Sequence, residues 1–118
     1  MELLSELDMM TCPMTYGCKN CGVELAESDD CISRNFRGVH GEAKLFAKAA
    51  NLDLGEPIDR HMTTGLNVIQ LAHCRQCKTC VGWRYGNAVI ESEKYKEGKY
   101  LLEMQLMVEK ESKLGSKL

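Results

Sequence analysis

The sequence lacks any apolar run near the ~20 residues that a helix needs to cross a bilayer, so we expect no membrane association. It also lacks the basic start of a secretory signal, because acidic residues stand at Glu2, Glu6 and Asp8. Without secretion, seven cysteines do not fit a disulfide framework, and the odd count argues against one too. We therefore expect a reducing compartment, the cytoplasm or the nucleus.

An excess of positive charge is absent as well. The formal net charge is −2 and the pI is about 5.9, which gives no general attraction to nucleic acid, so we do not expect nucleic acid as a partner. No histidine and glutamate have the spacing of a metalloprotease, and no cysteine-protease signature is present. The three histidines are scattered along the chain. We therefore expect no enzymatic activity.

Two Cys-x-x-Cys pairs are the most informative feature that the chain does contain. Cys18 and Cys21 form the first pair, Cys74 and Cys77 form the second, and 52 residues separate the two pairs. Four thiolates suit the tetrahedral coordination that Zn²⁺ prefers. We therefore predict one structural zinc ion at these four cysteines. Because such a site has no open coordination position, the metal is expected to stabilise the fold and not to catalyse.

Neighbouring residues leave alternatives to this ligand set. Cys80 extends the second pair to Cys-x-x-Cys-x-x-Cys, which begins like a bacterial iron–sulfur run, but no later cysteine completes that run. His73 stands beside Cys74 and is a competing ligand. Cys12, Cys31 and Cys80 are otherwise extra thiols, which we expect to be small buried hydrophobic residues.

The order of segments predicts one small, all-β domain. We expect an N-terminal tail or short helix at residues 1–13, a domain at 14–108 and a C-terminal tail at 109–118. Strands are expected in four places, and one further segment is ambiguous. Strand-like patterns cover residues 32–36, 60–73 (two strands about a glycine turn) and 81–85, and apolar residues alternate with the period of a strand over 100–108. The ambiguous segment is 43–54, whose alanines and lysines favour a helix.

Several longer blocks of sequence accompany the cysteine pairs. They are Tyr-Gly-Cys-Lys-Asn-Cys at 16–21, Ile-Ser-Arg-Asn-Phe-Arg-Gly at 32–38, Gly-Glu-Ala-Lys-Leu-Phe at 41–46, Thr-Thr-Gly at 63–65, Cys-Arg-Gln-Cys-Lys at 74–78, Gly-Trp-Arg-Tyr at 82–85 and Tyr-Lys-Glu-Gly-Lys-Tyr-Leu-Leu-Glu at 95–103. Together they resemble the Yippee family of small zinc-binding proteins over residues 16–107. The last two blocks, at their distances after the second pair, are the most specific.

The resemblance implies a mainly β fold, the β-tent, in which two antiparallel sheets meet near a Cys₄ zinc site. It assigns the metal to the same four cysteines, and the family has no cysteine at the position of Cys80. It further implies that residues 47–54 form a strand despite their helical composition. The same tent occurs in the thalidomide-binding domain of cereblon, in the centromere protein Mis18 and in B-type methionine sulfoxide reductases. Residues 99–107 lack the nucleophilic cysteine of those reductases.

For function, the resemblance implies a non-enzymatic regulatory adaptor of the nucleus and cytoplasm that binds other proteins. Some members associate with a CTLH/GID-type E3 ubiquitin ligase, so subunits of such a complex are the expected partners. Exposed aromatic residues and arginines are the expected anchors of the interface. The candidate interaction residues are Phe36, Arg37, His40, Trp83 and Tyr85.

Three alternatives remain beside the adaptor. The first is a small-ligand or peptide reader with a cereblon-like aromatic pocket at Trp83 and Tyr85, for which a cationic or cyclic-imide ligand would be suitable. The second is a centromere or nucleic-acid-associated protein of the Mis18 type. The third is a redox enzyme built on Cys31 or Cys80.

Overall fold

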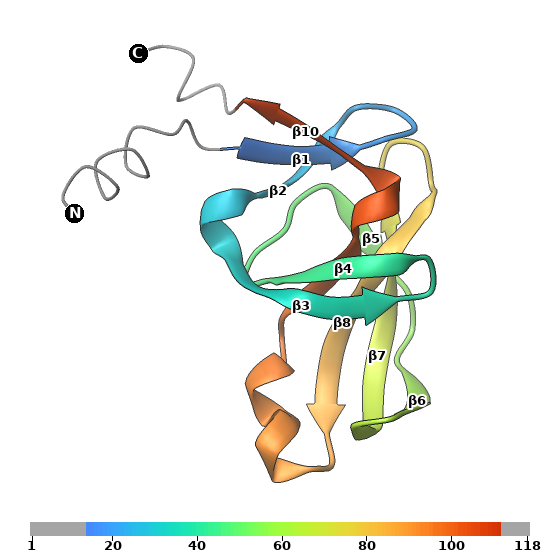
Figure 1. Ribbon diagram of the computed structural model, residues 1–118. Coiled ribbons are helices and arrows are strands. Elements are labelled where there is room, and N and C mark those ends of the chain that lie inside the picture. Colours follow the sequence, from blue (N-terminus) through green and yellow to red (C-terminus); the bar gives the residue numbers. More distant parts are fainter. Residues whose placement is uncertain (1–13, 112–118) are drawn as a thin grey trace, which may run out of the picture.

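Ten strands provide most of the regular structure (Figure 1). The computed structural model describes residues 14–111, so the segment expected as a tail or short helix at 1–13 lies outside the described residues, as does 112–118. The strands are β1 (Met14–Cys18), β2 (Glu24–Glu27), β3 (Cys31–Gly38), β4 (Gly41–Phe46), β5 (Leu52–Leu54), β6 (Ile58–Met62), β7 (Gly65–Cys74), β8 (Cys80–Ala88), β9 (Tyr100–Glu103) and β10 (Met107–Glu111). Three short 3₁₀ helices join them, η1 (Ser28–Asp30), η2 (Glu91–Lys96) and η3 (Met104–Leu106).

The strands form two antiparallel sheets, which confirms the mainly β prediction. The smaller sheet has the order β10-β1-β2 and lies at the top of Figure 1. The larger sheet has the order β3-β4-β9-β8-β7-β5, and β6 also pairs with β7. No helix within residues 14–111 is long and apolar enough to span a bilayer.

The central strands of the large sheet are buried on both faces, as β9 illustrates. Leu102 packs in a cluster with Tyr16 and Phe46, which fills the space between the two sheets. Its neighbour Leu101 points the opposite way and packs with Trp83 and other residues in a second cluster. Because successive side chains of a strand face opposite sides, one short strand serves both clusters. Both leucines are fully buried.

The resemblance is wrong about part of residues 47–54, where only β5 is a strand. The backbone of the preceding segment makes isolated hydrogen bonds and no ladder of strand pairs: Ala47 N–H donates to Asp30 of η1, and Ala50 N–H donates to Leu25 of β2. Asn51 then takes a left-handed φ of 59°. Such a residue interrupts the extended backbone that a strand requires.

The alternation over residues 100–108 spans two strands and not one. β9 belongs to the large sheet and β10 to the small sheet, and η3 carries the chain from one to the other. The last strand also continues past the expected boundary of the domain at residue 108. Lys110 and Glu111 pair with Thr15 and Met14 of β1, so 109–111 belong to the sheet and not to a tail.

Gly82 tests the packing of the large sheet. A Cβ atom added at this position would overlap the carbonyl oxygen of Leu101 on the adjacent strand β9. We expect Gly82→Ala to lower the free energy of unfolding by about 3 kcal/mol or more, because the backbones of β8 and β9 must separate. Gly55→Ala is the control, since its Cβ would meet the nearest atom at 3.7 Å, an ordinary contact. Similar urea midpoints for the two variants would contradict this packing.

Candidate metal centre and neighbouring cavity

The four predicted ligands meet where two turns approach each other between the sheets. Cys18 ends β1 and Cys21 lies in the turn before β2, while Cys74 ends β7 and Cys77 lies in the turn before β8. Their ligand atoms all lie within 4.8 Å of one another. Within residues 14–111, this is the only cluster of cysteine, histidine or acidic side chains with the spacing to hold a metal ion.

The two turns share one backbone arrangement. The residue after each pair donates its N–H to the carbonyl of the first cysteine, Gly22 to Cys18 at 2.7 Å and Lys78 to Cys74 at 2.7 Å. Both donors are left-handed, with φ of 86° at Gly22 and 70° at Lys78. This conformation turns the backbone sharply, so that the two cysteines of a pair lie close together.

The spacing of the sulfurs fits a tetrahedral ion. The Sγ atoms of Cys18 and Cys77 are 3.6 Å apart, and those of Cys21 and Cys74 are 3.4 Å apart. A disulfide would require about 2.05 Å. Four sulfurs at the usual Zn–S distance of ~2.3 Å are separated by about 3.8 Å. The donor set therefore suits a thiolate-bound metal that joins the two turns.

The pKa of the thiol differs from one of these cysteines to another. Hydrogen bonds from Thr79, then Asn20, lower the pKa of the Cys77 thiol to about 5. Burial raises the pKa of the Cys18 thiol to about 11. Four thiolates so close together repel one another, and a coordinated cation is what keeps such a set deprotonated.

The second turn is tied to β5 by charged groups. Arg75 Nε lies 3.1 Å from one carboxylate oxygen of Asp53, and Lys78 Nζ lies 3.0 Å from the other. The hydrogen bond from Lys78, then that from Arg75, lowers the pKa of Asp53. Since all three groups are largely exposed, their contribution is to the position of the turn more than to stability.

Within residues 14–111, the other cysteine and histidine side chains stay outside the cluster. His73 lies on β7 and is half-buried. Cys31 is half-buried, and its Sγ lies 3.5 Å from the carbonyl of Ser33. Cys80 is exposed, so the expectation of a buried thiol is wrong there: its neighbour Val81 takes the inward position of β8. Cys12 lies outside the described residues.

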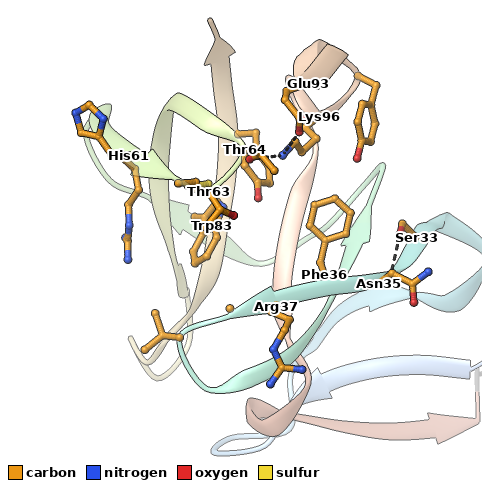
Figure 2. Close-up of a pocket in the computed structure, with 16 residues that line it drawn as sticks. Ser33, Asn35, Phe36, Arg37, His61, Thr63, Thr64, Trp83, Glu93 and Lys96 are labelled. Carbon is orange, nitrogen blue, oxygen red and sulfur yellow. Dashed lines mark hydrogen bonds and ion pairs between the residues drawn. The ribbon is translucent and has the colours of Figure 1, made fainter. Parts of the chain in front are cut away.

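A cavity of about 760 Å³ lies on the other face of the large sheet. Phe36, Arg37, Trp83 and Tyr85, four of the five predicted interaction residues, line it. Trp83 and Tyr85 are only 6% and 3% exposed, so they form its floor and are not the exposed anchors that we expected. In Figure 2, Phe36 and Arg37 leave β3 on opposite sides, with Phe36 toward the centre and Arg37 at the outer rim.

The fifth predicted residue, His40, is not among those that line the cavity. It lies in the turn between β3 and β4, which the buried carboxylate of Glu103 holds. Glu103 accepts the backbone N–H groups of Val39 at 3.1 Å and His40 at 2.7 Å, and its Oε1 is 3.4 Å from His40 Nδ1. His40 therefore helps to fix a wall of the cavity without facing into it.

The aromatic residues of the cavity pack edge to face. Ring centroids are 6.1 Å apart for Trp83 and Tyr85 and 6.5 Å apart for Phe36 and Tyr85. Burial raises the pKa of the Tyr85 phenol, and the nearby Trp83 indole N–H acts in the opposite direction, to lower this pKa. Even so, no hydrogen bond of acceptable geometry satisfies Trp83 Nε1 among the described residues, although the atom is buried.

Two cations that we did not predict from the sequence complete the cavity. The guanidinium of Arg60 lies 5.4 Å from the centroid of the Trp83 ring. Lys96 is only 3% exposed, and its ammonium lies 5.0 Å from the Tyr85 ring and 5.6 Å from the Phe36 ring. Glu93, at 2.6 Å, pairs with this buried ammonium (Figure 2). The Tyr-Lys-Glu-Gly-Lys block did contain Lys96, but nothing in it indicated burial.

Comparison with known proteins agrees with this architecture. The family described as Yippee zinc-binding/DNA-binding and Mis18, centromere assembly, matches residues 14–117. The chain belongs to the Yippee/Mis18 family. Human protein yippee-like 3 is 42% identical over 97 residues, which are 82% of this chain and 82% of that protein. Human protein yippee-like 4 is 44% identical over 97 residues, which are 82% of this chain and 76% of that protein.

A solved structure shows the same fold at low sequence identity. The crystal structure of the Mis18 "Yippee-like" domain superposes with a TM-score of 0.66, covering 85% of this chain and 97% of that chain at 16% identity. Membership in the family, two antiparallel sheets and the clustered cysteines therefore agree with one another. The family description as zinc-binding is consistent with the donor set of this chain.

Gly22 tests the turn geometry at the metal centre. A Cβ added at Gly22 would meet no atom within 4 Å, so its φ of 86° is the only obstacle to a larger side chain. We expect Gly22→Val to lower the free energy of unfolding by about 1–2 kcal/mol, and Gly22→Asn by less, because asparagine tolerates this conformation. Urea titration at a fixed metal concentration measures both. Equal losses in the two variants would contradict the left-handed turn.

Proposed function

We propose that the four cysteines hold one Zn²⁺ whose role is structural. The support is the donor set itself, four sulfurs with the spacing of a tetrahedral site, together with the zinc-binding description of the family. A zinc ion so held joins two segments far apart in the chain and supplies no reactive position. Binding of zinc contributes ~10–16 kcal/mol to folding in zinc-finger peptides, which exceeds the total stability of many domains.

Removal of the metal tests this role. We expect a strong chelator to abolish the cooperative thermal transition of the protein, and Cys21→Ser to do the same without chelator, since either leaves the turns unjoined. Cys80→Ser is the matched control, because Cys80 is exposed and outside the cluster. Circular dichroism at rising temperature measures the transition. An unchanged midpoint after chelation would refute a structural zinc.

We further propose that the protein is a non-enzymatic regulatory adaptor that acts by binding other proteins. The observation that carries this proposal is the cavity, whose walls come from the β3–β4 turn, the β6–β7 turn and η2. Its rim presents apolar side chains to solvent, Val39 with 67% and Tyr95 with 55% exposed. Exposed apolar groups around a preformed hollow are typical of interaction sites.

The partner that we propose is a subunit of a CTLH/GID-type E3 ubiquitin ligase, with the protein in the nucleus and cytoplasm. Membership in the Yippee/Mis18 family supports this part of the proposal, because the resemblance to that family is what led us to expect ligase subunits as partners. A reader of small ligands or peptides is the second candidate, and the volume of the cavity, about 760 Å³, favours it because this is the size of many ligand sites.

A matched pair of surface variants tests the adaptor. Val39→Asp places a charge on the rim, whereas Val89→Asp places one at 65% exposure outside the cavity lining. After affinity purification from the native cell, mass spectrometry should identify ligase subunits with the wild type and with Val89→Asp. With Val39→Asp we expect at least about a tenfold lower recovery of these subunits, since a charge must then be desolvated at the contact. Equal recovery with both variants would exclude this face as the contact.

A further inference from the structure

The cavity lies between two strand edges that no other strand of the described residues covers. Within the described strands, β3 is the terminal strand of the large sheet and pairs only with β4, and β6 pairs only with β7. Residues of both strands line the cavity, Asn35 on β3 and Arg60 on β6 among them, while β8 supplies the floor. Free strand edges pair readily with another extended chain, which lies along them by backbone hydrogen bonds.

The charges around the cavity are mostly positive. Arg37, Arg60 and Lys96 line it, and among the described residues Glu93 is the only carboxylate that does so. Glu93 is already paired with Lys96. Within residues 14–111, neither Arg37 nor Arg60 forms an ion pair. Although the chain has a net charge of −2, Arg37 and Arg60 therefore leave unpaired positive charge at this cavity.

The aromatic faces of the cavity are already occupied by cations of the protein itself. Arg60 covers the Trp83 ring, and Lys96 lies against Tyr85 and Phe36. A cationic ligand, which the aromatic residues suggested from the sequence, would have to displace these groups and would meet like charge. A ligand that complements the cavity would therefore carry negative charge and a hydrogen-bond acceptor for the buried Trp83 N–H.

We propose that this cleft binds an extended segment of a partner protein that carries a carboxylate side chain, received by Arg60 beside the Trp83 floor. The inference rests on the proposed adaptor function and names the chemistry of its partner. The segment lies along the free edge of β3, and apolar residues beside its carboxylate contact Val39 and Tyr95 on the rim. The unpaired edges favour a peptide over a free anion, because only a peptide satisfies their backbone groups.

Degenerate peptide pools test the proposal on the full-length, metal-loaded protein. Two decapeptide pools share the same apolar flanking positions, and one carries Asp or Glu at the central positions where the other carries Lys or Arg. Trp83 is the only tryptophan of the chain, so its fluorescence reports on the floor of the cavity. We expect the acidic pool to change this fluorescence saturably and the basic pool to have no effect. In isotope-labelled protein, amide signals of β3 should shift with the acidic pool.

Variants separate the carboxylate contact from general charge. Arg60→Gln should lower the affinity for the acidic pool by about tenfold or more, which is the usual effect of losing a charge-assisted hydrogen bond. Thr63→Asp adds a negative charge at an exposed position of the cavity lining, so it should also lower the affinity for the acidic pool, by repulsion. This variant leaves the partly buried Arg60 unchanged. Arg34→Gln is the matched control, because Arg34 is exposed on β3 but does not line the cavity. Unchanged thermal midpoints show that each variant is folded.

Several results would overturn the proposal. These are equal responses to the two pools, an Arg60→Gln affinity equal to that of Arg34→Gln, or saturation by adenosine monophosphate or inorganic phosphate without any response to the acidic pool. The last result would assign the cleft to a small anion. If Val39→Asp loses the cellular partner while neither pool binds, the adaptor function stands and the acidic segment is wrong.

Discussion

Four sulfur atoms from two turns, with 52 residues between the pairs, lie within 4.8 Å of one another, and we propose that the fold depends on a metal ion that joins them. Bringing such distant segments together costs conformational entropy, and four thiolates at this spacing repel one another. A bound dication offsets both effects at once. The small sheet enters the site through β1 and the large sheet through β7, so the same point also holds the sheets together.

The second cysteine turn is continuous with the strand that forms the floor of the cavity. β7 and β8 leave the second cysteine turn as a long hairpin (Figure 1). Further along β8, Trp83 and Tyr85 pack in the second cluster and line the cavity. The turns around this floor are held by buried polar groups, Glu103 under the β3–β4 turn and Lys96 within η2. The cysteine cluster thus lies at one end of the hairpin, and the cavity that we propose as the recognition site lies further along it.

Much of this could be predicted from the sequence, because some constraints are local. The cysteine pairs identify their ligands by spacing, and the turn at Gly65 separates two strands as expected. Predictions failed where distant contacts decide the outcome. Residues 47–51 bond to two other segments, and the alternation at 100–108 conceals a change of sheet. Arg60 joins the cavity only because β6 pairs with β7 and so faces Trp83, which no local pattern indicates.

The most direct test of the central constraint is the mass of the intact protein, purified without added metal and measured by native mass spectrometry. We expect one zinc ion per chain in the compact charge states, and metal-free protein only in the unfolded ones. A compact, metal-free chain as the dominant species would show that the fold does not depend on the ion, and would contradict the account.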